Sequence, residues 1–156
     1  MKTHLEEIRE IFSIFHDGTI VAHRISAETL DLEIEILYLT QRIDKAYTKF
    51  FLSLQNVHDF SFSTWPKDVN AAPTLIRDPA QIFAGELTIL SSDIKNGSVE
   101  IAMDQPSDGF DYCGGTLSFK ANTASVLDEG GKQYTVNELG QICEEYWAEW
   151  SRKSKT

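Results

Sequence analysis

Residues 29–37 read TLDLEIEIL, and this short stretch indicates the fold class. Four aliphatic residues alternate in it with three carboxylates. A period of two places the two sets on opposite faces of a β-strand, whereas a helix would scatter both sets around its axis. The stretch therefore predicts an amphipathic strand with one buried and one wet face, which is typical of antiparallel sheets.

Further strand patterns lie on both sides of this stretch. Residues 19–25 have a strand composition, and residues 26–28 form a short hairpin connection to the next strand. Asn96-Gly97 is the strongest tight-turn signal of the chain, because both residues tolerate a positive φ. The other strands are expected within residues 49–57, 59–65, 85–103 and 115–135.

Helical patterns bound the strands at each end of the chain. Residues 3–6 fit a capping box, and apolar residues then recur at helical spacing as far as the Asp17-Gly18 turn signal. A second capping box at residues 135–138 begins a helix whose apolar stripe, ending in residues 146–150, is expected to pack on the sheet. Since strands do not alternate with helices, residues 1–156 are predicted to form one α+β domain, with an N-terminal helix, a mostly antiparallel sheet of about seven or eight strands, and a C-terminal amphipathic helix.

Composition narrows the range of functions. Among 156 residues, 24 are acidic and 14 are basic, which gives a formal charge of −10. Phosphate binding requires basic clusters, and an anionic membrane would repel this chain, so neither nucleic acid nor membrane is an expected partner. There is no apolar run of about 20 residues, no secretion-signal layout, and the two cysteines match no metal pattern. A cytoplasmic protein without a cofactor is expected, whose charge keeps it soluble or steers a basic partner protein.

The His16-Asp17 pair leaves two interpretations open. The imidazole is suited to act as a general base or as a metal ligand, but no motif supplies a third group. The simpler interpretation is that His16 closes the first helix and that Asp17 and Gly18 turn the chain into the first strand. His23 and His58 lie in predicted strands, so a metal-dependent hydrolase that uses these four polar residues is the alternative function.

The segment DQPSDGFDYCGG, residues 104–115, is predicted to be an acidic surface loop. Its carboxylates do not have the spacing of a calcium-binding EF-hand loop. Aromatic residues among carboxylates are typical of protein-recognition surfaces. We therefore expect a binding surface that consists of Asp104, Asp108, Phe110, Asp111 and Tyr112.

The carboxylates of the stretch at residues 29–37 form a second candidate surface. Asp31, Glu33 and Glu35 are expected on the wet face of the strand, where they are available to a basic partner. A general acid-base pair of the kind found in glycosidases is the other interpretation of such a row, but it requires a cleft.

Four short segments carry a resemblance to known proteins: FHDGTI (15–20), GELTIL (85–90), GGTLSFKA (114–121) and YWAEW (146–150). The chain resembles a group of small bacterial proteins of uncharacterised or immunity type, some of which neutralise the toxins of contact-dependent or polymorphic toxin systems. The resemblance implies a non-enzymatic protein-binding module whose partner is another protein, for instance a basic toxin, and it assigns no catalytic residue. A homodimer formed through the aromatic C-terminal helix is a further alternative.

Overall fold

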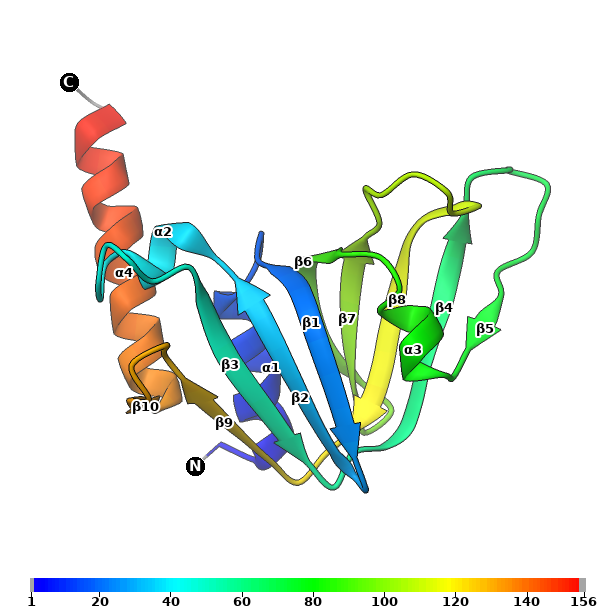
Figure 1. Ribbon diagram of the computed structural model, residues 1–156, viewed down its shortest axis with the longest axis horizontal. Coiled ribbons are helices and arrows are strands. Elements are labelled where there is room, and N and C mark those ends of the chain that lie inside the picture. The colour runs from blue at the N-terminus through cyan, green and yellow to red at the C-terminus, as the bar shows by residue number, and fades with distance from the viewer. Residues whose placement is uncertain (1, 155–156) are drawn as a thin grey trace.

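The computed structural model describes residues 2–154, which form an α+β structure in which a ten-stranded antiparallel sheet follows an N-terminal helix and precedes a C-terminal helix in the chain (Figure 1). This architecture confirms the predicted fold class. In chain order the elements are α1 (His4–Ile14), β1 (Thr19–Ser26), β2 (Thr29–Glu35), α2 (Leu37–Thr40), β3 (Lys49–Gln55), β4 (His58–Pro66), β5 (Leu75–Ile76), α3 (Pro79–Ile82), β6 (Leu87–Lys95), β7 (Ser98–Asp104), β8 (Tyr112–Lys120), β9 (Thr123–Leu127), β10 (Gln133–Tyr134) and α4 (Val136–Ser154).

The strand count differs from the prediction of about seven or eight. The two additional strands, β5 and β10, contain two residues each, and so short a segment cannot display a period of two. The start of β8 also differs, because this strand begins at Tyr112 and includes Cys113, which was expected in a loop. Its glycines Gly114 and Gly115 are buried, so their lack of side chains reflects close packing within the sheet.

The strand order in the sheet is β10-β9-β3-β2-β1-β6-β7-β8-β4-β5. Every neighbouring pair is antiparallel. At the centre of this order the pairing is short, since the long strands β1 and β6 pair only through Thr19 with Thr88 and Ile20 with Leu87. The sheet thus consists of two halves, one from β10 to β1 and the other from β6 to β5.

A continuous ladder also links the two outer parts of the sheet. Gln55 at the end of β3 pairs with Thr123 of β9, and three residues later His58 of β4 pairs with Lys120 of β8 in the same register. The N–H of Asn122 donates to the carbonyl of Gln55 between them, at 2.9 Å. The segments β3–β4 and β8–β9 therefore form one long, bent antiparallel pair, and Figure 1 shows the two halves converging at this bend.

Helix α1 fills the space between the two halves. The predicted capping box is present, with mutual hydrogen bonds between Thr3 and Glu6. Phe12 contacts Phe119 of β8 edge-on at 6.1 Å between ring centroids, and Phe15 stacks on Phe50 of β3 at 5.1 Å. Since β8 and β3 belong to different halves, this helix joins both halves in one hydrophobic core.

Helix α4 does not lie where the sequence predicted. Instead of packing on the sheet, it makes its main contacts with α1 and α2, and its C-terminal half extends past α2 (Figure 1). The reason is that β10 delivers the chain to the edge of the sheet. Leu139 near the start of the helix is buried, whereas Trp147 and Trp150 remain 37% and 54% exposed.

None of the helices within residues 2–154 combines the length and the apolar character needed to cross a membrane.

Candidate functional site

The acidic loop between β7 and β8 is held by its aromatic residues. The ring of Phe110 meets that of Tyr112 edge-on at 5.3 Å, and Tyr112 is only 6% exposed and lies 6.0 Å from Phe62. Both rings therefore face into the molecule and anchor the loop. The carboxylates differ from one another, since Asp108 and Asp111 are exposed and Asp104 is half-buried at the end of β7.

Gln105 fixes the base of this loop. It is 3% exposed, its N–H donates to the carbonyl of Cys113 at 2.8 Å, and its Oε1 accepts from the N–H of Ser107 at 3.1 Å. A side chain on Gly85 would collide with the Gln105 amide, so the glycine is needed for this close approach. Burial, and secondly the charge of Asp111, raises the pKa of Tyr112 above its ordinary value.

A second loop, residues 67–74, lies beside the first. The N–H of Lys67 donates to the carbonyl of Asp111 at 2.9 Å, and the N–H of Thr74 donates to Oγ1 of the buried Thr64 at 2.9 Å. A cavity of about 300 Å³ lies along this second loop, and its lining includes Asp68 of that loop and Asp111 of the first. We call residues 67–74 and 104–112 together the acidic loop pair.

The second predicted surface lies on the outer face of β2, in the other half of the sheet. Asp31 is 3.6 Å from Arg24, and Glu33 forms an ion pair with Lys49. Glu35 is exposed at the end of the strand. Two of the three carboxylates are thus compensated by cations, so this face is less acidic than the sequence suggests. The acidic loop pair and the β2 carboxylates are not brought together by the fold.

A shallow cavity of about 360 Å³ lies over this outer face. Its lining includes Asp31, Glu33 and Phe51, together with Leu127 of β9. The ammonium group of Lys49 lies 5.6 Å from the centre of the Phe51 ring, within the range of a cation–π interaction. Aromatic, cationic and carboxylate groups therefore occupy one patch.

The histidines have separate environments. Nδ1 of His16 is 2.9 Å from the carbonyl of Ser13, and its ring stacks on Trp147 at 5.8 Å. His23 lies 5.1 Å from Phe83, and Nδ1 of His58 is 2.9 Å from the carbonyl of Asn56. In the part of the chain from residue 2 to residue 154, no group of three histidine, cysteine or acidic side chains is placed to hold a metal ion.

The turn after α1 has a structural explanation. Asp17 has a φ of 70°, and its N–H donates to the carbonyl of Ile89 in β6 at 2.8 Å. A Cβ atom on Gly18 would lie 2.8 Å from the carbonyl oxygen of Phe15. His16 and Asp17 are neighbours at 4.0 Å, but His23 and His58 do not join them.

An aromatic cluster surrounds His16 where α4 passes α2. Tyr38 contacts Tyr146 at 4.7 Å and Trp147 at 5.9 Å, and Trp147 meets Trp150 edge-on at 5.8 Å. The Tyr38 hydroxyl donates to the carbonyl of His16 at 2.8 Å. The sequence indicated the stripe on α4 but not Tyr38, which follows a strand in a segment without a helical period.

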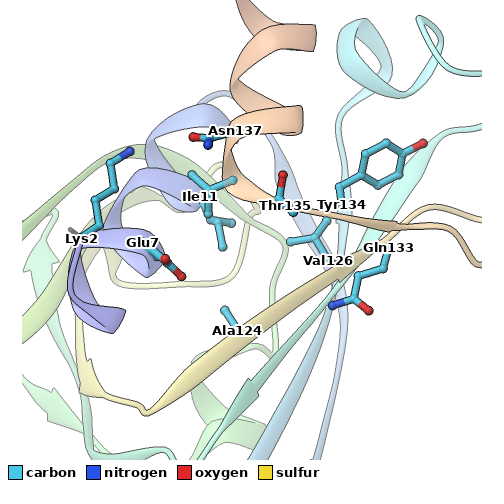
Figure 2. A pocket seen from close by; sticks show the side chains of 10 residues that line it. Lys2, Glu7, Ile11, Ala124, Val126, Gln133, Tyr134, Thr135 and Asn137 are labelled. Carbon is cyan, nitrogen blue, oxygen red and sulfur yellow. The ribbon is translucent and has the colours of Figure 1, made fainter.

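One cleft was not predicted from the sequence at all. It has a volume of about 520 Å³ and lies between α1, strands β9 and β10, and the start of α4. Figure 2 shows Glu7 and Ile11 of α1 on one side, with Ala124 and Val126 of β9 on the other. Its lining comes from the two ends of the chain, and no local pattern brings such distant residues together.

No protein-family model matches the sequence, and comparison with curated proteins and with solved structures also gives no significant match.

Proposed function

We propose that the chain is a non-enzymatic protein-binding module whose acidic loop pair engages a basic partner protein, and that it belongs to the immunity type, which neutralises a bacterial toxin. The proposal rests on the carboxylates of the acidic loop pair, several of which have no cationic side chain beside them. Asp68, Asp108 and Asp111 are exposed, and none forms an ion pair within residues 2–154. Between Lys95 and Lys120 the chain has four carboxylates and no lysine or arginine.

Rigid placement of these charges supports the same proposal. The buried ring of Tyr112 and the amide of Gln105 hold the first loop, and the Lys67–Asp111 hydrogen bond holds the second loop against it. A preordered surface loses less conformational entropy when it binds. A toxin that cleaves nucleic acid needs a basic active site, and an acidic surface would both attract that site and occupy it.

Such electrostatic steering predicts how the association rate depends on charge and on salt concentration. Complementary surfaces can raise association rates by about 10- to 1,000-fold, and this gain falls steeply as salt increases. At 0.15 M salt the screening length is about 8 Å, so only carboxylates close to the contact still act. Charge changes in the acidic loop pair should therefore slow association more than equal changes elsewhere.

The experiment is co-expression of the chain with the product of the adjacent gene, followed by measurement of association rates for the purified pair. The variant Asp108→Lys with Asp111→Lys is compared with Glu28→Lys with Glu144→Lys, which changes the net charge equally at distant exposed sites. We expect the loop variant to slow association at least about tenfold and to lose toxin protection, and the control to have a much smaller effect. Equal effects of both variants, or none, would show that the acidic loop pair is not the contact surface.

The β2 carboxylates are the second candidate surface for the same partner. Since Arg24 and Lys49 compensate Asp31 and Glu33, a partner cation would have to compete with them. Of the three, Glu35 is the most available. Glu35→Gln should therefore weaken binding more than Asp31→Asn, which changes the net charge equally, if this face takes part in the contact, and the same rate measurement decides it.

Homodimerisation through α4 is a second candidate role, and the exposure of two tryptophans favours it. Trp147 and Trp150 remain 37% and 54% exposed, although tryptophan contributes strongly to interfaces when it is covered. Sedimentation at several protein concentrations tests this role. A dimer that Trp150→Glu converts into a monomer would support it, whereas a monomer at every concentration would exclude it.

A further inference from the structure

Strand β9 is fully paired along one side but only partly paired along the other. Its whole length pairs with β3, from Thr123 with Gln55 to Leu127 with Phe51. On its other side β10 pairs only with Val126 and Leu127, because the chain leaves the sheet after Tyr134 to begin α4. Within the described residues, positions 123–125 therefore have no strand neighbour on that side.

The backbone direction of β9 places hydrogen-bonding groups at this uncovered edge. The N–H of Asp128 donates to the carbonyl of Lys132 at 3.0 Å, so the backbone of Asp128 points toward the β10 side. In a strand the backbone N–H and C=O groups of successive residues point alternately to the two sides. Those of Val126 and Ala124 therefore point to the same side as those of Asp128, away from β3. Ala124 thus presents its N–H and C=O at the open edge, and such an edge is a template for another strand.

The cleft of about 520 Å³ lies directly beside this edge. Ala124 and Val126 line it on the β9 side, Ile11 lies on the α1 side, and Gln133 and Asn137 also belong to its lining (Figure 2). The small side chain of Ala124 leaves space there that an apolar side chain of another chain can fill. A strand added along β9 would direct every second side chain toward this cleft.

The charge beside the cleft indicates what kind of partner segment would bind there. The carboxylate of Glu7 is exposed and forms no ion pair within residues 2–154, whereas Lys2 beside it is paired with Glu10. The free charge at the cleft is therefore negative, which favours a cationic segment. A helical segment has no free amides for the backbone of Ala124, and β10 already shows that this edge accepts an antiparallel strand.

From these observations we infer that the open edge of β9 binds an extended, basic segment of a partner polypeptide as an additional strand in line with β10, with one apolar side chain in the cleft between Ala124 and Ile11. This surface is separate from the acidic loop pair. A partner can engage the two surfaces independently, so each proposal can fail without the other.

The probe for this inference is a synthetic eight-residue peptide in which lysine alternates with valine. Its binding to the isotopically labelled full chain is followed by shifts of backbone amide signals and by hydrogen exchange. We expect shifts concentrated at residues 123–126 and at Ile11, and slower exchange of the Ala124 amide. The same peptide methylated on the alternate amide nitrogens that would face β9 cannot form the new ladder, so it should bind at least about tenfold more weakly.

Two variants test the edge from the protein side. Ala124→Pro removes the outward N–H without removing a hydrogen bond to β3, since proline is tolerated where the N–H of an edge strand faces solvent. Ala124→Leu keeps the N–H and fills the cleft, and it remains informative if the proline variant does not fold. Both variants should lower the affinity for the peptide at least about tenfold. Ser125→Ala should bind the peptide normally, because the Ser125 side chain lies on the opposite face of the strand.

Three outcomes would overturn the inference. The methylated peptide could bind as tightly as its parent, both Ala124 variants could bind normally, or the amide shifts could map to the acidic loop pair alone. The last result would mean that the peptide is held by charge only, and Asp108→Lys with Asp111→Lys would then abolish its binding. If the inference is right, that double variant leaves the shifts at residues 123–126 in place.

Discussion

The Tyr134 hydroxyl donates a hydrogen bond of 2.7 Å to Oδ2 of Asp128 across the hairpin that joins β9 and β10. Oδ1 of the same carboxylate accepts from the N–H groups of Gly130 and Lys132, at 2.9 and 3.0 Å. Burial raises the pKa of Asp128, which is 4% exposed, but these hydrogen bonds outweigh burial and hold its pKa below the ordinary value. One carboxylate therefore organises the turn that places β10 on the edge of β9.

Replacing this carboxylate should destabilise the protein in a pH-dependent manner. Asp128→Asn is expected to lower the free energy of unfolding by about 2 kcal/mol at pH 7, because hydrogen bonds to a charged acceptor are lost. The folded pKa lies below the unfolded value of about 3.9, so the stabilisation is present above that pH and is lost as the pH falls through the folded pKa. Urea unfolding should show the deficit of the variant shrinking between about pH 4 and pH 2. A deficit that is constant over this range would contradict the assignment.

Local patterns predicted the elements of the fold better than their arrangement. The alternation in residues 29–37 identifies β2, and the two capping boxes identify the starts of α1 and α4. Nothing in the sequence near Gln55 or Asn122 indicates that β3–β4 and β8–β9 form one bent ladder. That pairing joins residues far apart in the chain, and it depends on the register of whole strands rather than on any local preference.

The same limit explains what was missed in the candidate sites. Exposure of Asp108 and Asp111 follows from their polarity, but the inward direction of Phe110 depends on contact with Gly85, which lies in a different connection. The uncovered edge of β9 results from where the two-residue strand β10 ends. Composition can predict an acidic surface, whereas its shape and neighbours are set by tertiary contacts.

Two glycines should tolerate substitution very differently. A Cβ atom on Gly115 of β8 would lie 2.5 Å from Cζ of Phe62 and 2.5 Å from the carbonyl oxygen of Ser63, so Gly115→Ala must displace the neighbouring strand. We expect a loss of about 3 kcal/mol from this overpacking. Gly97 in the β6–β7 turn has a φ of +76° with open space around it, so Gly97→Ala should cost only about 1 kcal/mol. Thermal unfolding ranks the two variants, and the reverse order would show that the sheet is less tightly packed at Gly115 than described.

Substitutions beside α1 and at the exposed end of α4 should lower the free energy of unfolding by different amounts. Phe15 is fully buried and stacks on Phe50 at 5.1 Å, so Phe15→Ala should lower the free energy of unfolding by about 3–5 kcal/mol. Trp150 is a larger side chain, but it is 54% exposed, and Trp150→Ala should cost less than about 1 kcal/mol. Urea unfolding at low protein concentration measures both losses. A large loss from Trp150→Ala that increases with protein concentration would instead indicate that α4 is covered in a dimer.

Tyr38 should contribute a stabilisation that disappears at alkaline pH. Burial, and then the neighbouring acidic groups of Cys143 and Asp17, raise the pKa of Tyr38 above its ordinary value, and its hydroxyl donates to the carbonyl of His16. Tyr38→Phe should therefore cost about 1 kcal/mol at neutral pH. Because the folded pKa is above the unfolded value of about 10, the advantage of the native side chain is complete below that pH and decreases as the pH rises toward the folded pKa. Urea unfolding between about pH 7 and pH 11 should show the difference between the two proteins narrowing above about pH 10.

Tyr146→Phe is the matched control, since the Tyr146 ring belongs to the same cluster but no hydrogen bond of its hydroxyl is found within residues 2–154. A Tyr38→Phe deficit that stays constant up to pH 11 would mean that the hydroxyl is not held in this buried hydrogen bond.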